Sequence, residues 1–126
     1  VREGGDATIV AWGPAVPDAL EAAEALAAEG IEADVIDLRT LVPLDMEPVL
    51  ASVAKTGRCV VAAQAVLSGS YVNEVVARVV NEAFDDLDAP VARIGAANGI
   101  SPQAEGLEAA FLPGVDDIAN AVKGLI

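Results

Sequence analysis

The sequence has 126 residues, of which 54% are hydrophobic, and this length and composition predict a single folded domain over residues 1–126 rather than a disordered chain. Seven Lys and Arg residues stand against 20 Asp and Glu residues, a formal charge of −13, which argues against binding to nucleic acids and to anionic membranes. The sequence has no histidine and one cysteine, so it lacks the commonest general base and metal ligand, and the lone thiol favours a reducing, cytoplasmic location.

The chain alternates short apolar runs with segments rich in Ala, Leu and Glu, a pattern typical of strands and helices in an α/β layer fold. Strands are expected at 7–12, 31–38, 58–63 and 91–95, and helices at 15–29, 45–55, 72–83, 107–112 and 115–125. Gly30 lies where a glycine ends a helix, and Asp45 is placed to cap the second helix. The third strand is apolar on both faces and is expected inside the sheet. No run is apolar over the roughly 20 residues that a membrane span needs, and no secretory leader is recognised.

The helix at 72–83 has the clearest periodicity in the chain. Its apolar residues recur at the three- and four-residue spacing of one helical face, and polar residues occupy the other face. Because valine is a mediocre helix former, packing against the rest of the domain must stabilise this helix. The apolar face consists of Val72, Val75, Val76, Val79, Val80 and Ala83.

The sequence at 36–45 (IDLRTLVPLD) carries a resemblance to a known family. It resembles the C-terminal domain of the β subunit of thiamine-diphosphate-dependent 2-oxo acid dehydrogenases, the E1 component of branched-chain or pyruvate type. That domain is also the C-terminal domain of the transketolase family. Residues 13–23, 87–91 and 107–113 match further pieces of the family pattern. The resemblance implies an α/β fold, a three-layer αβα sandwich around a five-stranded mixed, mostly parallel sheet with one antiparallel edge strand.

The resemblance also implies what this chain does not do. Thiamine diphosphate and Mg²⁺ are implied only for the full parent enzyme, so no catalytic residue, cofactor or metal is expected in this chain. In the family, this domain packs subunits together in an α2β2 tetramer with the E1 α subunit and helps to dock the E2 acyltransferase core. The isolated chain is therefore expected not to be an enzyme.

The chain departs from the family pattern in two segments. Ala63 stands where the family usually has a histidine, Gln64 stands where it has a glutamate, and Val72 stands where a glycine is common. The second departure covers residues 96–106, where the family usually has a proline-rich, often aromatic segment. By resemblance, both segments lie on the edge that meets other domains and subunits. We interpret them as redesign of the surface of an excised domain, with natural drift as the alternative.

The segment between the third strand and the helix at 72–83 is unusually apolar for a loop. Its side chains either pack into the core of the domain or form the centre of a self-association interface, where tyrosine and aliphatic anchors concentrate binding energy. The second interpretation predicts a symmetric homo-oligomer, with a dimer favoured. The candidate interface residues are Ala63, Gln64, Val66, Leu67, Tyr71, Val72 and Ile100.

Two alternatives to a redesigned assembly module stay open. One is a natural E1 β fragment that contributes to subunit assembly and E2 docking in the thiamine-dependent oxidative decarboxylation of 2-oxo acids. The other is a domain that binds a small ligand in a crevice at the carboxyl ends of its strands.

Two groups of charged residues are predicted to be structural. Asp37 and Arg39 are expected to form an ion pair at the end of the second strand that fixes the following loop. Asp85, Asp86 and Asp88 lack the alternating oxygen ligands and the glycine of a calcium loop, so they indicate a solvated helix end rather than a cation site.

Two further features are candidates for reactive or binding sites. Cys59 lies in an apolar strand, where a thiol behaves as a small buried hydrophobe rather than a nucleophile. The Ser68-Gly69-Ser70 turn lacks the spacing and the lysine of a P-loop, so anion binding there is the less favoured interpretation.

Overall fold

The computed structural model describes residues 2–39, 45–66, 71–96 and 114–126. These contain four strands, four α-helices and one short 3₁₀ helix. In chain order they are β1 (Ala7–Ala11), α1 (Ala15–Ala28), β2 (Ala33–Asp37), α2 (Glu47–Thr56), β3 (Cys59–Val66), α3 (Tyr71–Ala83), η1 (Phe84–Asp86), β4 (Ala92–Ala96) and α5 (Val115–Leu125). None of the helices in these ranges has the length and apolarity needed to cross a membrane.

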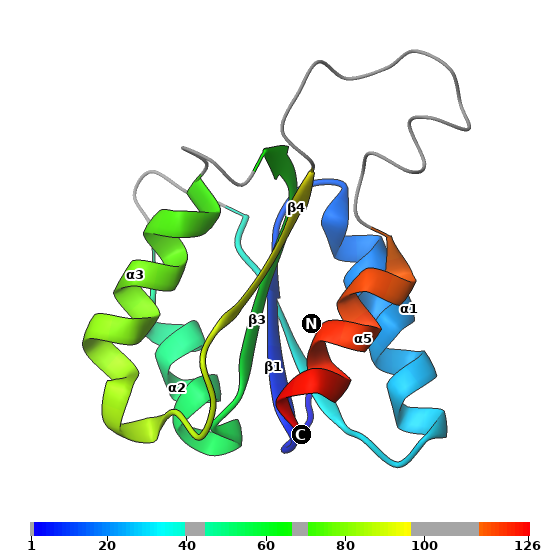
Figure 1. Cartoon of the computed structure of the whole chain (residues 1–126), viewed down its shortest axis with the longest axis horizontal. Helices are drawn as coiled ribbons and strands as arrows, with labels where there is room; N and C mark the ends of the chain where they lie inside the picture. The colour runs from blue at the N-terminus through cyan, green and yellow to red at the C-terminus, as the bar shows by residue number, and fades with distance from the viewer. Residues whose placement is uncertain (1, 40–44, 67–70, 97–113) are drawn as a thin grey trace.

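The strands form one parallel sheet in the order β2-β1-β3-β4, and the helices cover both of its faces (Figure 1). Helices α1 and α5 lie on one face, and α2 and α3 lie on the other. This confirms the predicted three-layer α/β sandwich. The order also places β3 inside the sheet, as its apolar sequence predicted.

The predicted count of five strands is not reproduced in the described residues, whose sheet has four strands. The antiparallel element is reduced to a single bridge between Arg2 and Val35 at the outer edge of β2. The Arg2 N–H donates to the Val35 carbonyl at 3.4 Å, and the Val35 N–H donates to the Arg2 carbonyl at 2.8 Å. One paired residue is too little to form a strand, so the described sheet is parallel rather than mixed.

The two faces of the sheet bury two separate apolar clusters because successive side chains of a strand point to opposite faces. Ile9 and Val60 pack with α1 and α5, whereas Val10 and Val61 pack with α2 and α3. All four side chains are completely buried. The sheet core is therefore filled by strand residues that alternate between the two helical layers.

The ends of several elements differ from the prediction. Strand β3 continues to Val66 instead of ending at residue 63, and helix α2 begins at Glu47 with Met46 as its cap. The Asp45 carboxylate still accepts a hydrogen bond from the Glu47 N–H at 3.1 Å, one residue outside the predicted position. Gly30 has a φ of +86° and follows α1, as expected of a helix-terminating glycine. The helix expected at 107–112 lies outside the described residues.

Candidate functional site

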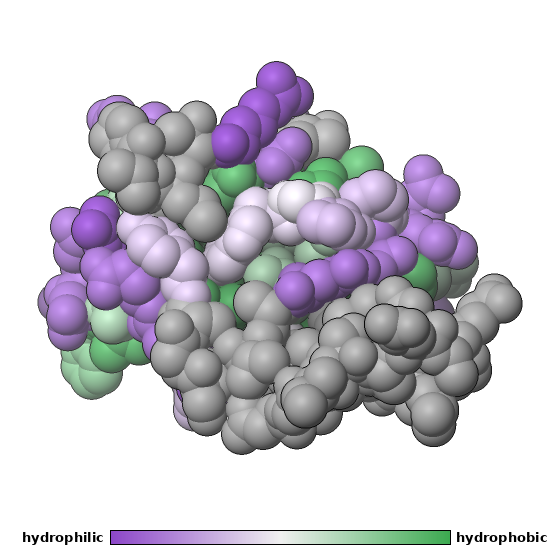
Figure 2. Space-filling model, turned by 90° about the horizontal axis from the view of Figure 1, so that it is seen from above, coloured by the Kyte–Doolittle hydropathy of each residue, from purple (hydrophilic) through white to green (hydrophobic). Residues whose placement is uncertain are grey.

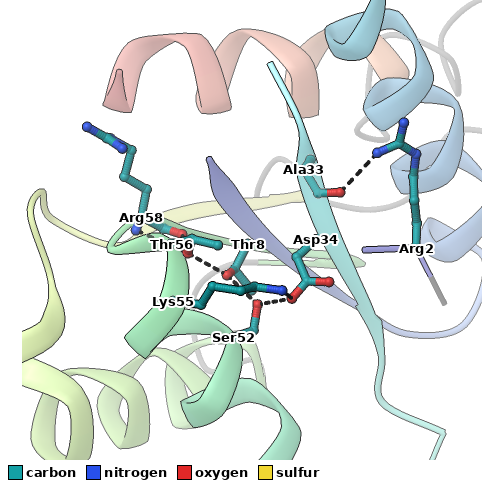
Figure 3. Close-up of polar contacts among 8 residues, drawn as sticks. All are labelled: Arg2, Thr8, Ala33, Asp34, Ser52, Lys55, Thr56 and Arg58. Carbon is teal, nitrogen blue, oxygen red and sulfur yellow. Dashed lines mark hydrogen bonds and ion pairs between the residues drawn. The ribbon is translucent and has the colours of Figure 1, made fainter. Parts of the chain in front are cut away.

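A buried polar network joins α2 to β1 and β2 (Figure 3). The Thr8 hydroxyl lies 2.6 Å from that of Ser52 and 2.7 Å from that of Thr56. Ser52 donates its only hydroxyl proton to the Asp34 carboxylate, so Thr8 must donate to Ser52. All four residues are at most 6% exposed. We call Thr8, Asp34, Ser52 and Thr56 the Thr8 network.

The Thr8 network ends at a shallow polar crevice on the surface. The Lys55 ammonium lies 3.2 Å from the Asp34 carboxylate, and Lys55 is half exposed while Asp34 is buried. Arg2, on the other side, donates to the Ala33 carbonyl at 3.2 Å and pairs with Glu32 at 3.3 Å. Within the described residues, no buried side-chain nitrogen or oxygen lacks a hydrogen-bond partner. The arrangement therefore positions α2 on the sheet.

Ala63 and Gln64 lie toward the carboxyl end of β3, and this end of the sheet faces the viewer in Figure 2; Tyr71 and Val72 begin α3. Ala63 is 1% exposed and Val72 is completely buried, and both belong to the apolar cluster under α2 and α3. Their side chains contribute to the core of the domain, which is the alternative that the sequence left open. The expected end of this strand at Ala63 was wrong, because β3 continues for three more residues.

The other candidates in this region are partly described. Gln64 and Tyr71 are half-buried, and Tyr71 packs against the same apolar cluster. Val66 is the last residue of β3, and its side chain lies outside the described part, as do Leu67 and Ile100. An interface role for Gln64, Val66, Leu67, Tyr71 and Ile100 therefore stays a prediction.

The predicted ion pair at the end of β2 is present. The Arg39 Nε lies 3.6 Å from the Asp37 carboxylate. The Arg39 side chain is 84% exposed and that of Asp37 is 21% exposed. Exposed pairs of this kind contribute only about 0–1 kcal/mol to stability, so the pair orients the strand end more than it stabilises the fold.

The structure describes two other sequence features that were candidates for reactive or binding sites. Cys59 is completely buried, and burial raises the pKa of its thiol to about 12. A thiol of such high pKa is a poor nucleophile near neutral pH. In the described residues, Asp85, Asp86 and Asp88 do not form a group of three or more ligands that could hold a metal ion. The turn at 68–70 lies outside those residues.

The structure also contains an apolar groove that the sequence reasoning missed. It encloses about 720 Å³ between the C-terminal half of α3 and the chain that leads into β4. Two exposed carboxylates, Asp85 and Asp88, also line it. A signal was available, because residues 76, 80 and 84 continue the apolar pattern at four-residue spacing beyond the buried stripe of α3. We call this the α3 groove; its apolar lining is Val76, Val80, Phe84, Leu87, Pro90 and Val91.

Comparisons with known proteins identify relatives over nearly the whole chain. The family model of the transketolase C-terminal domain matches residues 1–118. The chain is 50% identical to the pyruvate dehydrogenase E1 component subunit beta of Leifsonia xyli over 122 residues, 97% of this chain and 36% of that protein. The corresponding subunit of Bacillus subtilis is 37% identical and covers 99% of this chain and 38% of its own length. The chain thus spans a little over a third of these two relatives.

A solved structure supports the same assignment. It is described as a split-gene transketolase, an inactive β4 tetramer, and it matches 98% of this chain and 40% of its own chain. The TM-score is 0.82 at 31% sequence identity. The four-stranded α/β arrangement is therefore that of a transketolase C-terminal domain.

Proposed function

This chain belongs to the transketolase C-terminal domain family, and from that premise we propose that it is the assembly domain of a pyruvate dehydrogenase E1 β subunit and takes no direct part in catalysis. The observation that carries the proposal is the 50% identity to an E1 β subunit over 97% of this chain. That likeness extends over both helical layers and the sheet, so it concerns the whole domain rather than a motif.

The chemistry of the chain supports a role in assembly. The sequence has no histidine, and its one thiol is buried with a pKa raised to about 12. The buried polar side chains Thr8, Asp34, Ser52 and Thr56 are engaged with one another. Such a domain lacks histidine, the commonest general base, and offers shape and surface to its neighbours.

Thiamine diphosphate and Mg²⁺ belong, in this proposal, to the rest of the longer enzyme. A magnesium site in such enzymes needs hard oxygen ligands beside the diphosphate. The described residues contain no group of three or more His, Cys, Asp or Glu side chains that could hold a metal ion. On this proposal we assign the group no ligand among the described residues. A cytoplasmic location accompanies the proposal, because the lone thiol suits a reducing compartment.

The partners of the domain follow from the same proposal. We expect it to pack against the remainder of the β subunit, against an E1 α subunit and against E2. Self-association is a second candidate, favoured by the tetrameric state of the transketolase whose fold it shares; a symmetric dimer is the simplest form. Redesign of the surface is not needed for Ala63 and Val72, because both side chains are core residues.

A chimera tests the proposed function. This chain replaces the matching third of the Leifsonia xyli β subunit, which is co-produced with the α subunit of that organism. We expect the chimera to assemble, as measured by light scattering, and to decarboxylate pyruvate in the presence of thiamine diphosphate and Mg²⁺. The isolated chain should have no such activity. A chimera that is folded by circular dichroism but neither assembles nor turns over pyruvate would overturn the proposal.

A matched variant separates failure to fold from failure to assemble. Val79 is completely buried on α3, whereas Glu24 is exposed on α1. The chimera with Val79→Asp should lose its fold and its activity, and the chimera with Glu24→Gln should keep both. Light scattering of the isolated chain over a range of concentrations tests the second candidate, which a monomer at every concentration contradicts.

A further inference from the structure

We propose that Lys55 is a site of lysine acylation and that loss of its charge releases α2 from the sheet. The Lys55 side chain is 48% exposed, and its ammonium lies 3.2 Å from the Asp34 carboxylate. Lys55 belongs to α2 and Asp34 belongs to β2, so the ion pair joins this helix to the outer strand of the sheet (Figure 3). This effect does not depend on the proposed function, because it concerns contacts within the chain.

The sequence has two lysines, Lys55 and Lys123, which differ in the carboxylate that each one pairs with. Both lysines form ion pairs, and their side chains are similarly exposed, at 48% and 41%. A small reagent in solution therefore reaches either amine. The Asp34 side chain is 8% exposed, whereas that of Glu29, 2.8 Å from Lys123, is 53% exposed. Of the two lysines, Lys55 alone would leave a buried carboxylate without its countercharge if it became neutral.

Asp34 depends on Lys55 for its countercharge. Among the ion pairs of the described residues, the pair with Lys55 is the one that Asp34 forms. Ser52 donates a hydrogen bond to the same carboxylate oxygen, but a neutral hydroxyl does not balance the charge. A buried carboxylate is costly unless it is both paired and hydrogen-bonded. Removing one partner of a buried pair therefore destabilises a protein more than the intact pair stabilises it.

The loss would extend beyond the ion pair, because Asp34 is one end of the Thr8 network. Ser52 and Thr56 lie on α2 with Lys55, and the Thr8 hydroxyl joins them. An unpaired Asp34 carboxylate gains hydration by moving toward water, which breaks its hydrogen bond from Ser52 and leaves that hydroxyl to find a new acceptor. A change of charge at one side chain is thus converted into undocking of a helix, as in other modification switches.

The polar crevice beside Lys55 has room for a small acyl donor. It has a volume of about 380 Å³, and its charged lining is Arg2, Glu3, Asp34 and Lys55. Because a guanidinium pairs well with phosphate, Arg2 favours an acyl phosphate as the donor.

The acylation step needs no oxidant or reductant. The Lys55 ammonium first releases a proton to water, and the neutral amine attacks the acyl carbon. An amide C–N bond forms while the bond from that carbon to the phosphate oxygen breaks, and the departing phosphate takes the second proton from the nitrogen. The product is a neutral amide with one N–H in place of the three of the ammonium, so it can no longer balance the Asp34 charge.

Acetyl phosphate and proteins with one encoded acetyllysine test the proposal. After incubation with acetyl phosphate, peptide mass spectrometry should find acetyl groups on both Lys55 and Lys123. Urea unfolding then compares the two acetyllysine proteins. We expect Lys55→acetyllysine to raise the equilibrium constant for unfolding about tenfold or more, because Asp34 is buried. Lys123→acetyllysine should raise it less than about threefold, because its partner is exposed.

A partner without charge distinguishes this mechanism from a general loss of stability. Asp34→Asn keeps an acceptor oxygen for Ser52 and removes the buried charge. In that background Lys55→acetyllysine should change the unfolding constant less than about twofold, and it should restore the fold if Lys55→acetyllysine alone does not fold. In the wild-type background, hydrogen exchange should become faster in α2 while α1 and α5, across the sheet, are unchanged.

Three results would overturn the proposal. The first is the absence of an acetyl group on Lys55 in a sample in which Lys123 is acetylated. The second is an equal rise of the unfolding constant in the two acetyllysine proteins. The third is an undiminished effect of Lys55→acetyllysine in the Asp34→Asn background, which would mean that the buried charge is not the cause.

Discussion

Two regions that meet at the C-terminal end of α2 use polar and apolar groups in opposite ways. In the Thr8 network, Thr56 and three other polar side chains are buried and satisfy one another. One residue further along, the Gly57 carbonyl accepts a hydrogen bond from Asp88, which lines the α3 groove. There, apolar side chains are exposed and carboxylates lack ion-pair partners in the described residues.

The comparison distinguishes buried polar side chains, which the fold needs for its stability, from exposed apolar side chains, which it does not. Burying a hydroxyl or carboxylate without a partner is costly, so a polar cluster under a helix must be complete for the domain to be stable. An exposed phenylalanine contributes little to folding, because its ring remains largely in water. The Thr8 network is thus explained by stability, whereas the α3 groove is not.

The largest effect should come from introducing a charge on the core side of α3. Val79 is completely buried and Val80 is 37% exposed at the groove. We expect Val79→Asp to destabilise the domain by about 4 kcal/mol or more, because it buries an unpaired carboxylate. The neighbouring Val80→Asp should cost less than about 1 kcal/mol. Urea unfolding followed by circular dichroism measures both. Equal losses would mean that the groove side of α3 belongs to the core.

Much of this contrast can be predicted from the sequence of α3 alone. The spacing of Val72, Val75 and Val79 identified the buried stripe, and all three are completely buried. The predicted helix at 115–125 has the bounds observed for α5. Strong periodicity succeeds because the core accepts only one face of a helix. The periodicity did not show that the apolar residues of α3 extend beyond the face that the core covers. Val80 and Phe84 lie on that additional part and are exposed.

Other features could not be predicted because they depend on contacts between distant residues. The Thr8 hydroxyl forms hydrogen bonds with hydroxyls 44 and 48 positions away in the sequence, and the Asp34 carboxylate accepts one from a hydroxyl 18 positions away. No local pattern indicates that these hydroxyls and the carboxylate converge. The end of β3 was also missed, because Gln64 and its neighbours have no strong turn signal and β4 pairs with Val66 across an irregularity in the register. Pairing with a neighbouring strand outweighed local propensity there.

The next largest effect should come from removing one member of the Thr8 network. Thr8→Val keeps the shape of the side chain but removes the hydroxyl that joins Ser52 and Thr56. We expect a loss of about 1–3 kcal/mol in the free energy of unfolding, because buried polar atoms lose a partner. In a double-mutant cycle with Thr56→Val, the two losses should not add.

An exposed pair at the other end of the strands is the control for that cycle. Arg39 is 84% exposed and follows β2. Combined with Thr8→Val, Arg39→Gln should be additive within about 0.5 kcal/mol. Full additivity of Thr8→Val and Thr56→Val would contradict the existence of a coupled network.

A smaller, pH-dependent effect should come from Cys59. Burial raises the pKa of its thiol from 9.0 to about 12. Between these values the unfolded chain has released the proton and the folded chain retains it, so stability falls as pH rises. The slope is about 1.4 kcal/mol per pH unit. We expect the stability difference between the wild type and Cys59→Ala to be constant below pH ~8 and to narrow above the pKa of the unfolded thiol. Urea unfolding of both proteins measures this difference. A difference that stays constant as the pH rises through this range would contradict burial of the thiol.

The smallest effect on stability should come from Phe84→Ser. Truncating a buried phenylalanine typically costs about 3–5 kcal/mol, because the removed ring leaves a cavity. Phe84 is 70% exposed, so removing its ring would leave little or no cavity. We expect the free energy of unfolding to change by less than about 0.5 kcal/mol, as for other surface substitutions. Such a result would mean that the ring contributes little to the stability of the fold. A loss of several kcal/mol would instead make Phe84 part of the core and would remove the distinction between the two regions.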